Sequence, residues 1–219
     1  MHTKSLSLAM IIILLLLPVS STSAEDEKHK NLAVVLDFNL SCLETESCVA
    51  DEPAHLVEFF GADWCEPCRD IEKILDQTVI SDPELLVLHH HPSIDDVFFL
   101  NSSLNLAESV YGVDGLPTLV LDSNSKLLGA TESKQIRDLY TSGEGIGDEG
   151  VELTVELTKN GSNTKVEWQI NNMHMDIYWE LDIILTAVVT EQENGTVWNR
   201  SVISLEPLLV IGNSSQGIW

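Results

Sequence analysis

One stretch constrains the fold of this chain more than any other: an apolar run followed at once by two closely spaced cysteines. Residues 56–60 form a run of strand length that ends at a Gly-Ala-Asp turn. Cys65 and Cys68 follow at C-x-x-C spacing. Apolar residues then recur with a helical period, at Ile71, Ile74, Leu75 and Val79. The pattern predicts a strand, a turn, and a helix that begins at the cysteines.

Thiol–disulfide exchange suits a cysteine pair in this position. The unpaired N–H groups and the dipole of a helix N-terminus stabilise a thiolate at Cys65. Cys68, one turn into the helix, is close enough to form a small disulfide ring with it. Exchange needs an exposed attacking thiolate and a resolving thiol within reach. The alternatives are a structural disulfide or half of a zinc knuckle, but no second C-x-x-C or C-x-x-H completes a zinc site.

Two motifs of this chain resemble the thioredoxin superfamily. Residues 64–68 (Trp-Cys-Glu-Pro-Cys) match the Trp-Cys-x-Pro-Cys core of that family, and residues 107–121 are similar to its helix, loop and cis-proline strand. The resemblance covers residues 31–142. It implies a thioredoxin-like α/β sandwich in which Cys65 attacks and Cys68 resolves.

The resemblance also implies a role for the proline at position 117. In the family this proline follows a cis peptide bond, here Leu116–Pro117, and lies against the disulfide, where the preceding backbone pairs with a substrate chain. A cis bond costs little only before proline. The alternative is an ordinary proline at the start of a strand.

Glu58 matches, in part, the buried acid that the family uses to take the proton of the resolving cysteine. That acid usually lies six residues before the first cysteine, whereas Glu58 lies seven before Cys65, with Gly61 as the extra residue. If Gly61 forms a bulge, Glu58 faces the cysteines. If it does not, Phe59 takes that place and Glu58 is a solvated strand residue.

The neighbours of the cysteines have opposing effects on the attacking thiol. The carboxylate of Glu66 should raise the Cys65 pKa, and the guanidinium of Arg69 should lower it. The sequence leaves the sign of the net shift open. We expect the rim of the site to be formed, without a part in the chemistry, by Asp63, Trp64, Glu66, Pro67, Arg69 and Leu116.

Two further cysteines, Cys42 and Cys48, lie in a polar insertion at residues 39–55. In an oxidising compartment the simplest interpretation is a local structural disulfide. The alternative is a second redox pair that passes electrons to or from the Cys65–Cys68 pair.

Three consecutive histidines, His89 to His91, follow a predicted strand at 85–88 and raise the possibility of a metal site. His89 and His91 would point to one face of the strand, and Asp95 and Asp96 could add ligands. Histidines at a strand end are more often a polar exit from the sheet, so we predict no metal. No nucleotide or flavin site is indicated, and the predicted cofactor is the cysteine pair itself.

The N-terminal segment and the net charge indicate the cellular location of the protein and the partners that it excludes. Residues 1–24 combine a basic start, an apolar core and small residues, which together predict a secretory signal peptide cut before Glu25. We therefore expect an exported protein: periplasmic, extracellular or at the cell surface. The formal charge of −24 repels nucleic acid and anionic membranes. Membrane attachment is expected only if the signal segment stays uncleaved.

Four regions follow in order: the signal peptide at 1–24, the thioredoxin-like domain at 31–142, a linker rich in Gly and acidic residues at 141–150, and a β module at 151–219. In the β module, apolar residues alternate with polar ones and Asn-Gly pairs mark two hairpin turns. Four or five antiparallel strands in a small, sandwich-like arrangement are predicted. Its three tryptophans are interpreted as core residues: Trp168, Trp179 and Trp198.

Within 31–142 the expected order of elements is β-β-α-β-α-β-β-α. The first strand is predicted at 32–38 and the second helix at 101–111. A hairpin is predicted from 118–121 and 126–130, and a closing helix, capped by Ser133, at 134–140.

Two functions are compatible with this sequence. The first is an exported thiol–disulfide oxidoreductase that exchanges disulfides with protein or small-molecule thiols, or with another oxidoreductase. The second is a redox-inert thioredoxin-like scaffold whose β module binds another envelope or surface protein. In the second case Cys65 would be unreactive and the pair a permanent staple. We favour the first.

Overall fold

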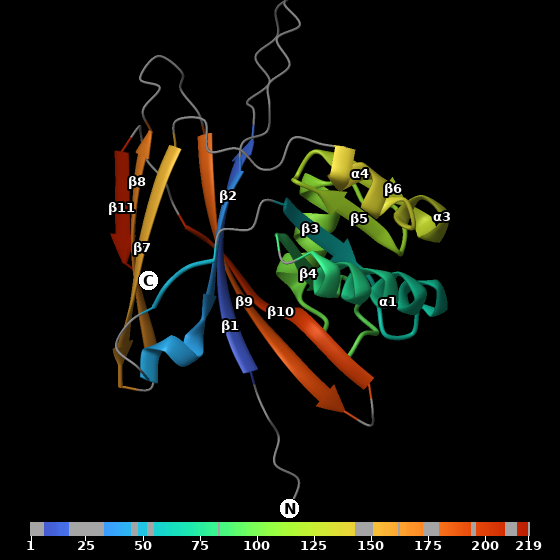
Figure 1. Cartoon of the computed structure of the whole chain (residues 1–219), viewed down its shortest axis with the longest axis horizontal. Coiled ribbons are helices and arrows are strands. Elements are labelled where there is room, and N and C mark those ends of the chain that lie inside the picture. The colour runs from blue at the N-terminus through green and yellow to red at the C-terminus, as the bar shows by residue number, and fades with distance from the viewer. Residues whose placement is uncertain are drawn as a thin grey trace, which may run out of the picture.

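The computed structural model describes residues 7–17, 33–44, 48–51, 55–82, 84–142, 151–161, 163–172, 180–193, 196–208 and 214–218. Over these residues the strands form two sheets. The larger has the order β2-β1-β9-β10-β4-β3-β5-β6, and the smaller has the order β11-β8-β7. In Figure 1 an α/β unit with helices α1, α3 and α4 lies to the right, and the smaller sheet lies to the left.

The α/β unit is built on four adjacent strands of the larger sheet. Strand β3 (His55–Phe60) pairs in parallel with β4 (Leu85–His90) and antiparallel with β5 (Thr118–Leu121). Strand β6 (Ser125–Leu128) forms the antiparallel edge. Leu56 to Phe60 and all of β4 are buried, which is why these strands are almost continuously apolar in sequence.

Helix α1 (Glu66–Ser81) follows β3 as predicted. Cys65 is its N-cap, with extended φ and ψ, and a proline in the first turn loses no intrahelical hydrogen bond. Its buried face consists of Cys68, Ile71, Leu75 and Thr78. The helix ends at Asp82, whose backbone N–H donates to the Thr78 carbonyl. This face packs with alternate residues of β3, β4 and β5 in one core cluster.

The remaining helices are short. The helix predicted at 101–111 is present as α2 (Asn101–Asn105) continued by one π-helical segment, η2 (Leu106–Val110). After β6 the chain forms α3 (Gly129–Ser133) and α4 (Ile136–Ser142). The prediction for Ser133 was wrong: this residue is the last of α3 and is buried, so it caps no following helix.

The first predicted strand is present as β2, but it does not join the four strands of the α/β unit. Strand β2 (Ala33–Asn39) pairs with β1 (Ser7–Leu17) and does not lie beside β4. The place next to β4 is taken by β10 (Thr196–Leu208), which joins it in parallel through Ser201 and His89. Pairing with β1 along its whole length, from Ala33 to Asn39, holds β2 away from the α/β unit.

The apolar segment near the N-terminus is strand β1 in the uncleaved chain. It pairs antiparallel with both β2 and β9 (Glu180–Glu193). The predicted signal peptide and its cleavage before Glu25 stay a prediction; cleavage would remove β1 from this sheet. Within the described residues no helix has the length and apolar character needed to cross a membrane.

The C-terminal region is all β, as predicted, but its strands divide between two sheets. Strands β7 (Val151–Asn160), β8 (Asn163–Asn172) and β11 (Ser214–Ile218) form the smaller sheet. Gly161, with φ of 66°, makes the tight turn between β7 and β8. Strands β9 and β10 instead extend the larger sheet up to β4, because Ser201 bridges to it.

Among the described residues, the C-terminal strands therefore contribute to both sheets, and β10 borders the α/β unit at β4. Trp168 is buried, consistent with a core position. Trp198 lies in β10, and Trp179 lies outside the described residues. Most of the predicted linker, residues 143–150, also lies outside them.

Candidate active site

Cys65 and Cys68 form a disulfide at the N-terminus of α1, with their Cα atoms 5.2 Å apart. The strand-turn-helix sequence brings them there, since β3 ends at Phe60 and the turn lies between Gly61 and Trp64. The backbone N–H of Cys68 donates to the Cys65 carbonyl at 3.1 Å. Cys65 is only 4% exposed in this disulfide and Cys68 is fully buried, so the expected exposed thiol is not seen in the oxidised form.

Gly61 fits the turn because the ring of Phe59 lies against it. A Cβ atom on Gly61 would come within 2.6 Å of the Phe59 ring. The Gly61 N–H donates to the carbonyl of His90 at the end of β4, 3.1 Å away. The extra residue in this turn is therefore held by β4 and packed onto the preceding strand.

Phe59, and not Glu58, faces the cysteines. Phe59 belongs to the core cluster that contains Cys65, Cys68 and Ile71. Side chains alternate along a strand, so Glu58 points to the opposite face of the sheet. The resemblance had suggested Glu58 as the acid beneath the resolving cysteine, and the structure does not bring the two together. The prediction of a solvated Glu58 was also wrong, because its exposure is 1%.

Glu58 instead belongs to a buried polar cluster under α2 and η2. The hydroxyl of Tyr111 donates to Glu58 Oε2. Nε2 of His90 lies 3.5 Å from Glu58 Oε1, and Nδ1 of His90 lies 3.1 Å from the Ser103 hydroxyl. Burial, reinforced by the neighbouring Glu58, raises the pKa of Tyr111, which stays protonated as a donor. This cluster ties β3 to the segment that leads towards Pro117.

The Leu116–Pro117 peptide bond is cis, the geometry implied by the resemblance. Pro117 is buried, and its carbonyl accepts from the Gly129 N–H at 2.8 Å. Leu116 packs against the core cluster that contains both cysteines. The structure thus brings the C-x-x-C pair and the cis-proline segment to one place, although they lie some fifty residues apart in the chain.

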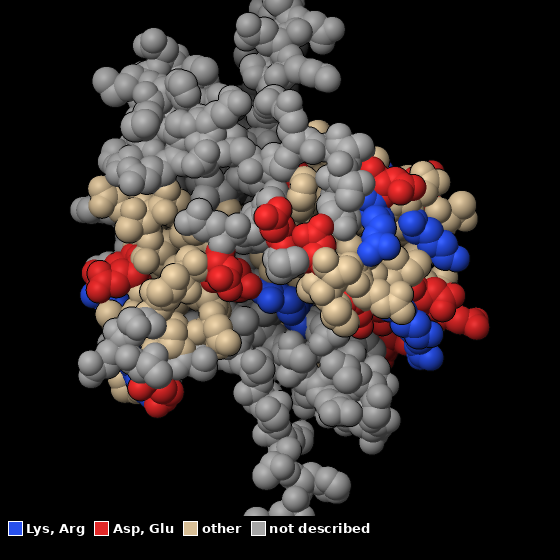
Figure 2. All heavy atoms as spheres, viewed as in Figure 1, with Lys and Arg blue, Asp and Glu red and all other residues tan. Residues whose placement is uncertain are grey.

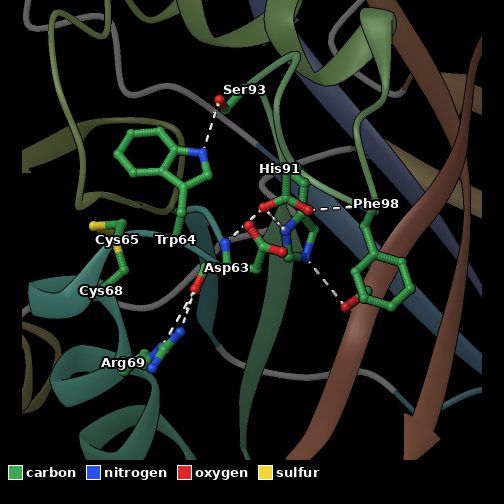
Figure 3. A network of polar contacts seen from close by, with 10 residues as sticks. Asp63, Trp64, Cys65, Cys68, Arg69, His91, Ser93 and Phe98 are labelled. Atoms are coloured by element: carbon green, nitrogen blue, oxygen red, sulfur yellow. Dashed lines mark hydrogen bonds and ion pairs between the residues drawn. A yellow bond between two sulfur atoms is a disulfide. The ribbon is translucent and has the colours of Figure 1, made fainter. Parts of the chain in front are cut away.

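The predicted rim residues surround the turn on its outer side. Trp64 is 57% exposed, and its indole Nε1 donates to the Ser93 hydroxyl at 3.1 Å. Arg69 is exposed and donates from Nε and Nη2 to the Asp63 carbonyl, at 3.3 and 2.8 Å. Figure 3 shows these contacts beside the disulfide. Glu66 and Pro67 are exposed in the first turn of α1.

The three histidines lie in three different environments, although all are buried. His89 packs edge-on against Phe59, with ring centroids 5.2 Å apart, and burial, together with the nearby His91, His90 and Arg200, lowers its pKa to about 3. His90 stacks on Phe60. Among the described residues, no group of three or more His, Cys, Asp or Glu side chains could hold a metal ion. The prediction that the histidines form a polar exit was wrong, since they are core residues.

A buried carboxylate, Asp96, holds the turn before Cys65. Its Oδ2 accepts from the Asp63 N–H at 2.7 Å and lies 3.0 Å from His91 Nδ1, and its Oδ1 accepts from the Phe98 N–H at 2.8 Å. Burial opposes the charge, but these hydrogen bonds, that of His91 foremost, hold the pKa of Asp96 below its usual range. The sequence suggested Asp96 only as a metal ligand, because nothing in its spacing pointed to the turn.

Glu72 is a second group that the sequence did not single out. It follows Cys68 by four residues on α1 and is partly buried. Burial, partly offset by the nearby His91, raises its pKa to about 7. Side chains four residues apart lie on one face of a helix, so this spacing is the signal that could have identified it.

The second disulfide, Cys42–Cys48, is present as predicted, with Cα atoms 4.9 Å apart. Cys42 lies in η1 (Leu40–Glu44), whose Glu44 forms an ion pair with Lys159 of β7 at 2.5 Å. In Figure 1 η1 lies beside the smaller sheet, whereas α1 lies in the α/β unit. The structure therefore does not place the two disulfides together, which supports the structural role over the relay.

Comparisons with known proteins give two findings. No family model and no curated protein matches the sequence. Among solved structures, the chain is similar to mitochondrial thioredoxin 3 from Saccharomyces cerevisiae in its oxidized form, at 24% identity and a TM-score of 0.32 over 41% of this chain and 79% of that one. It is also similar to a mutant thioredoxin from Halobacterium salinarum NRC-1, at 24% identity and a TM-score of 0.33 over 48% of this chain and 83% of that one.

The fold of this region follows from its own strand order and from the positions of the cysteines and the cis-proline. Strands β4, β3 and β5 lie in that order, with β3 and β4 parallel and β5 antiparallel. The cysteine pair begins the helix after β3, and a cis-proline precedes β5. Residues 55–142 therefore form a thioredoxin-like α/β unit.

Proposed function

We propose that this protein is an exported thiol–disulfide oxidoreductase that works through the Cys65-Glu66-Pro67-Cys68 pair. The observation that carries the proposal is the disulfide at the N-terminus of α1, packed with Leu116 beside a cis-proline. A disulfide in that position can open to a thiolate that the helix N-terminus stabilises. A merely structural staple needs neither the helix N-terminus nor the cis-proline.

In the reducing direction, the Cys65 thiolate attacks one sulfur of a substrate disulfide. The Cys65–substrate disulfide forms, and the other substrate sulfur leaves as a thiolate that takes a proton from solvent. Cys68 then loses its proton and attacks the sulfur of Cys65, which releases the second substrate thiolate. The protein ends as the Cys65–Cys68 disulfide, and the substrate has gained two electrons. The same steps in reverse oxidise a substrate dithiol.

The electrostatics around the pair support reactivity at Cys65. The guanidinium of Arg69 donates to the carbonyl of Asp63, two residues before Cys65, and its positive charge favours a thiolate there. Glu66 is exposed and is better solvated than a buried carboxylate would be, so it opposes a thiolate less. The partners we propose are protein or small-molecule thiols and disulfides, or another oxidoreductase. No metal or organic cofactor is part of this proposal.

The sequence pattern of residues 1–24 supports export of the proposed enzyme, and its net charge supports solubility. A net charge of −24 disfavours nucleic acid and anionic membrane partners. Figure 2 shows acidic and basic side chains interspersed over the visible face of the α/β unit. A partner that meets this visible face would find charges of both signs and not a single basic patch.

A second candidate, a redox-inert scaffold, is favoured by one observation: Cys65 is almost covered in the disulfide form. Alkylation after mild reduction separates the two functions. If the protein is an oxidoreductase, Cys65 should react with iodoacetamide at pH values well below about 8.5, the usual pKa of a thiol. Cys42 and Cys48 should not react, because they stay joined as a disulfide. Mass spectrometry locates the label, and a Cys65→Ser variant shows which signal belongs to Cys65.

The scaffold function would be supported if Cys65 failed to react until the protein was unfolded. It would also be supported if Cys42 and Cys48 were reduced and labelled before Cys65. Either result would remove the oxidoreductase proposal.

A further inference from the structure

A continuous chain of buried hydrogen bonds connects the C-terminal strand β10 to the turn before Cys65. It runs from the Ser201 hydroxyl to His91 Nε2 at 3.2 Å, from His91 Nδ1 to Asp96 at 3.0 Å, and from Asp96 to the Asp63 N–H at 2.7 Å. Figure 3 shows His91 between the turn and β10. The side chains of His91 and Asp96 are 2% and 0% exposed, and Ser201 is 1% exposed.

The polar groups in this chain satisfy one another. Asp96 uses both oxygens, one for Asp63 and His91 and the other for the Phe98 N–H. With its proton on Nδ1, His91 donates to the carboxylate, and its Nε2 is then the acceptor for the Ser201 hydroxyl. Loss of the Ser201 hydroxyl would remove the β10 end of this chain of hydrogen bonds. The position of the turn is thereby linked to the position of β10.

The backbone of β10 is shaped to present Ser201. The pairing of β10 with β9 shifts register between Trp198 and Ser201, and Arg200 has φ of 49°, a left-handed conformation that is rare outside glycine. Bulges of this kind redirect a side chain. Arg200 also forms an ion pair with Asp37 of β2 at 2.5 Å, and Ser201 bridges to His89 of β4. Two anchors therefore hold the bulge where Ser201 meets His91.

Asp96, His91 and Ser201 are hydrogen-bonded in succession as an acid, a base and a hydroxyl, the arrangement found in serine hydrolases. Burial excludes that activity here. Ser201 and His91 are both almost fully buried, so no substrate carbonyl can reach the hydroxyl. The arrangement transmits position and does not perform acyl transfer.

We propose that Ser201, through His91 and Asp96, is a positioning residue for the turn that presents Cys65, so that the C-terminal strands complete the redox site instead of forming an appended module. This inference rests on the proposed oxidoreductase function for its catalytic meaning. Its structural core, the link from β10 to the turn, can be tested without any turnover.

The test compares Ser201→Ala, which removes the hydroxyl, with Ser201→Thr, which keeps it. Ser204→Ala, on the same strand and partly buried, is the matched control. The first readout is native-state hydrogen exchange at the Asp63 amide relative to the core amides of β3. The second is the pH midpoint for alkylation of Cys65 in the reduced protein.

The proposal predicts that Ser201→Ala speeds exchange at Asp63 about three- to tenfold relative to the β3 amides, the loss expected for one weakened hydrogen-bond chain. It also predicts a shift of about half a pH unit in the Cys65 midpoint. Ser201→Thr and Ser204→Ala should behave as the unchanged protein does.

Unchanged exchange at Asp63 in Ser201→Ala would overturn the proposal, as would equal acceleration of all amides. Faster exchange at Asp63 with an unmoved Cys65 midpoint would also overturn it, because β10 would then hold the turn without affecting the redox site. A Cys65 that never alkylates in the folded protein would instead count against the oxidoreductase function, while the exchange result would still decide the link.

Discussion

At the scale of single residues, the alternation of β3 decides which side chain meets the cysteines. The sequence offered Glu58 as an acid near Cys68, and the position of Gly61 left its face open. The structure places Phe59 on the cysteine face and buries Glu58 with Tyr111 and His90. A carboxylate on the other face of a sheet cannot accept a proton from Cys68 directly.

Glu58→Gln should therefore leave the pH midpoint of Cys65 alkylation unchanged. The same change should lower the free energy of unfolding by about 1–3 kcal/mol, because an amide NH2 replaces one of the two buried carboxyl oxygens that face the Tyr111 hydroxyl and His90 Nε2. Urea unfolding and alkylation profiles of the two proteins measure both effects. A midpoint displaced by a full pH unit would show that Glu58 does act on the cysteines.

Glu72 should make stability depend on pH. Burial raises its pKa in the folded chain to about 7 from an ordinary 4.5. Between these values the folded state binds more protons than the unfolded state, so the contribution of this group is full below about pH 4.5 and is lost as pH rises through about 7. Glu72→Gln should thus be more stable than the unchanged protein at pH 8, by about 1 kcal/mol after allowance for its partial exposure.

Thermal unfolding of both proteins at pH 4.5 and pH 8 provides the measurement for Glu72. The difference between them should grow with pH. A difference that is the same at both pH values, or that favours the unchanged protein at pH 8, would mean that Glu72 is not protonated near neutrality.

At the scale of elements, the sequence predicted the helices and strands whose apolar pattern lies within their own residues. The helical period after Cys68, and the residues 118–121, correspond to α1 and β5. Two features depend on parts of the chain that lie outside their own segments. Ser133 ends α3 because the chain forms two short helices there, and β2 lies away from β4 because β1 pairs with it. The sequence pattern of residues 134–140 does not show that the chain forms two short helices there. The pattern of residues 32–38 does not show that β1 pairs with this strand.

Gly61 connects the residue and element scales, because the turn depends on its lack of a side chain. Gly61→Ala would bring a Cβ within 2.6 Å of the Phe59 ring, which is buried in the core and has little room to move aside. The expected loss is about 1–3 kcal/mol of unfolding free energy. Gly115→Ala is the control, since nothing lies within 4 Å of its Cβ position. Equal stability of the two variants in urea would contradict this packing.

At the scale of the whole molecule, the sequence predicted the strands of the C-terminal region but not where they pair. Asn-Gly turns and period-two patterns identify hairpins, and β7 with β8 is such a hairpin. The parallel bridge from Ser201 to His89 joins residues more than a hundred positions apart. Such pairing depends on two surfaces that only the folded chain brings together.

Removal of the C-terminal strands should therefore damage the α/β unit. A chain that ends at Ser142 would expose the edge of β4, and with it His89 and His91, which are buried in the whole protein. We expect it to aggregate or to unfold without a cooperative transition. A cooperative thermal transition at the temperature of the full chain, with no aggregation by light scattering, would show that the two regions are independent.

The central claim, that Cys65–Cys68 is a redox-active pair, is tested most directly by its equilibrium potential. The measurement is a titration of the protein with reduced and oxidised glutathione, with Cys68→Ser as the control that cannot form this disulfide. We predict a reversible two-electron transition between about −270 mV, the value of a reductant, and about −120 mV, the value of an oxidant. A pair that stays oxidised to well below about −300 mV would be a structural bridge and would contradict the claim.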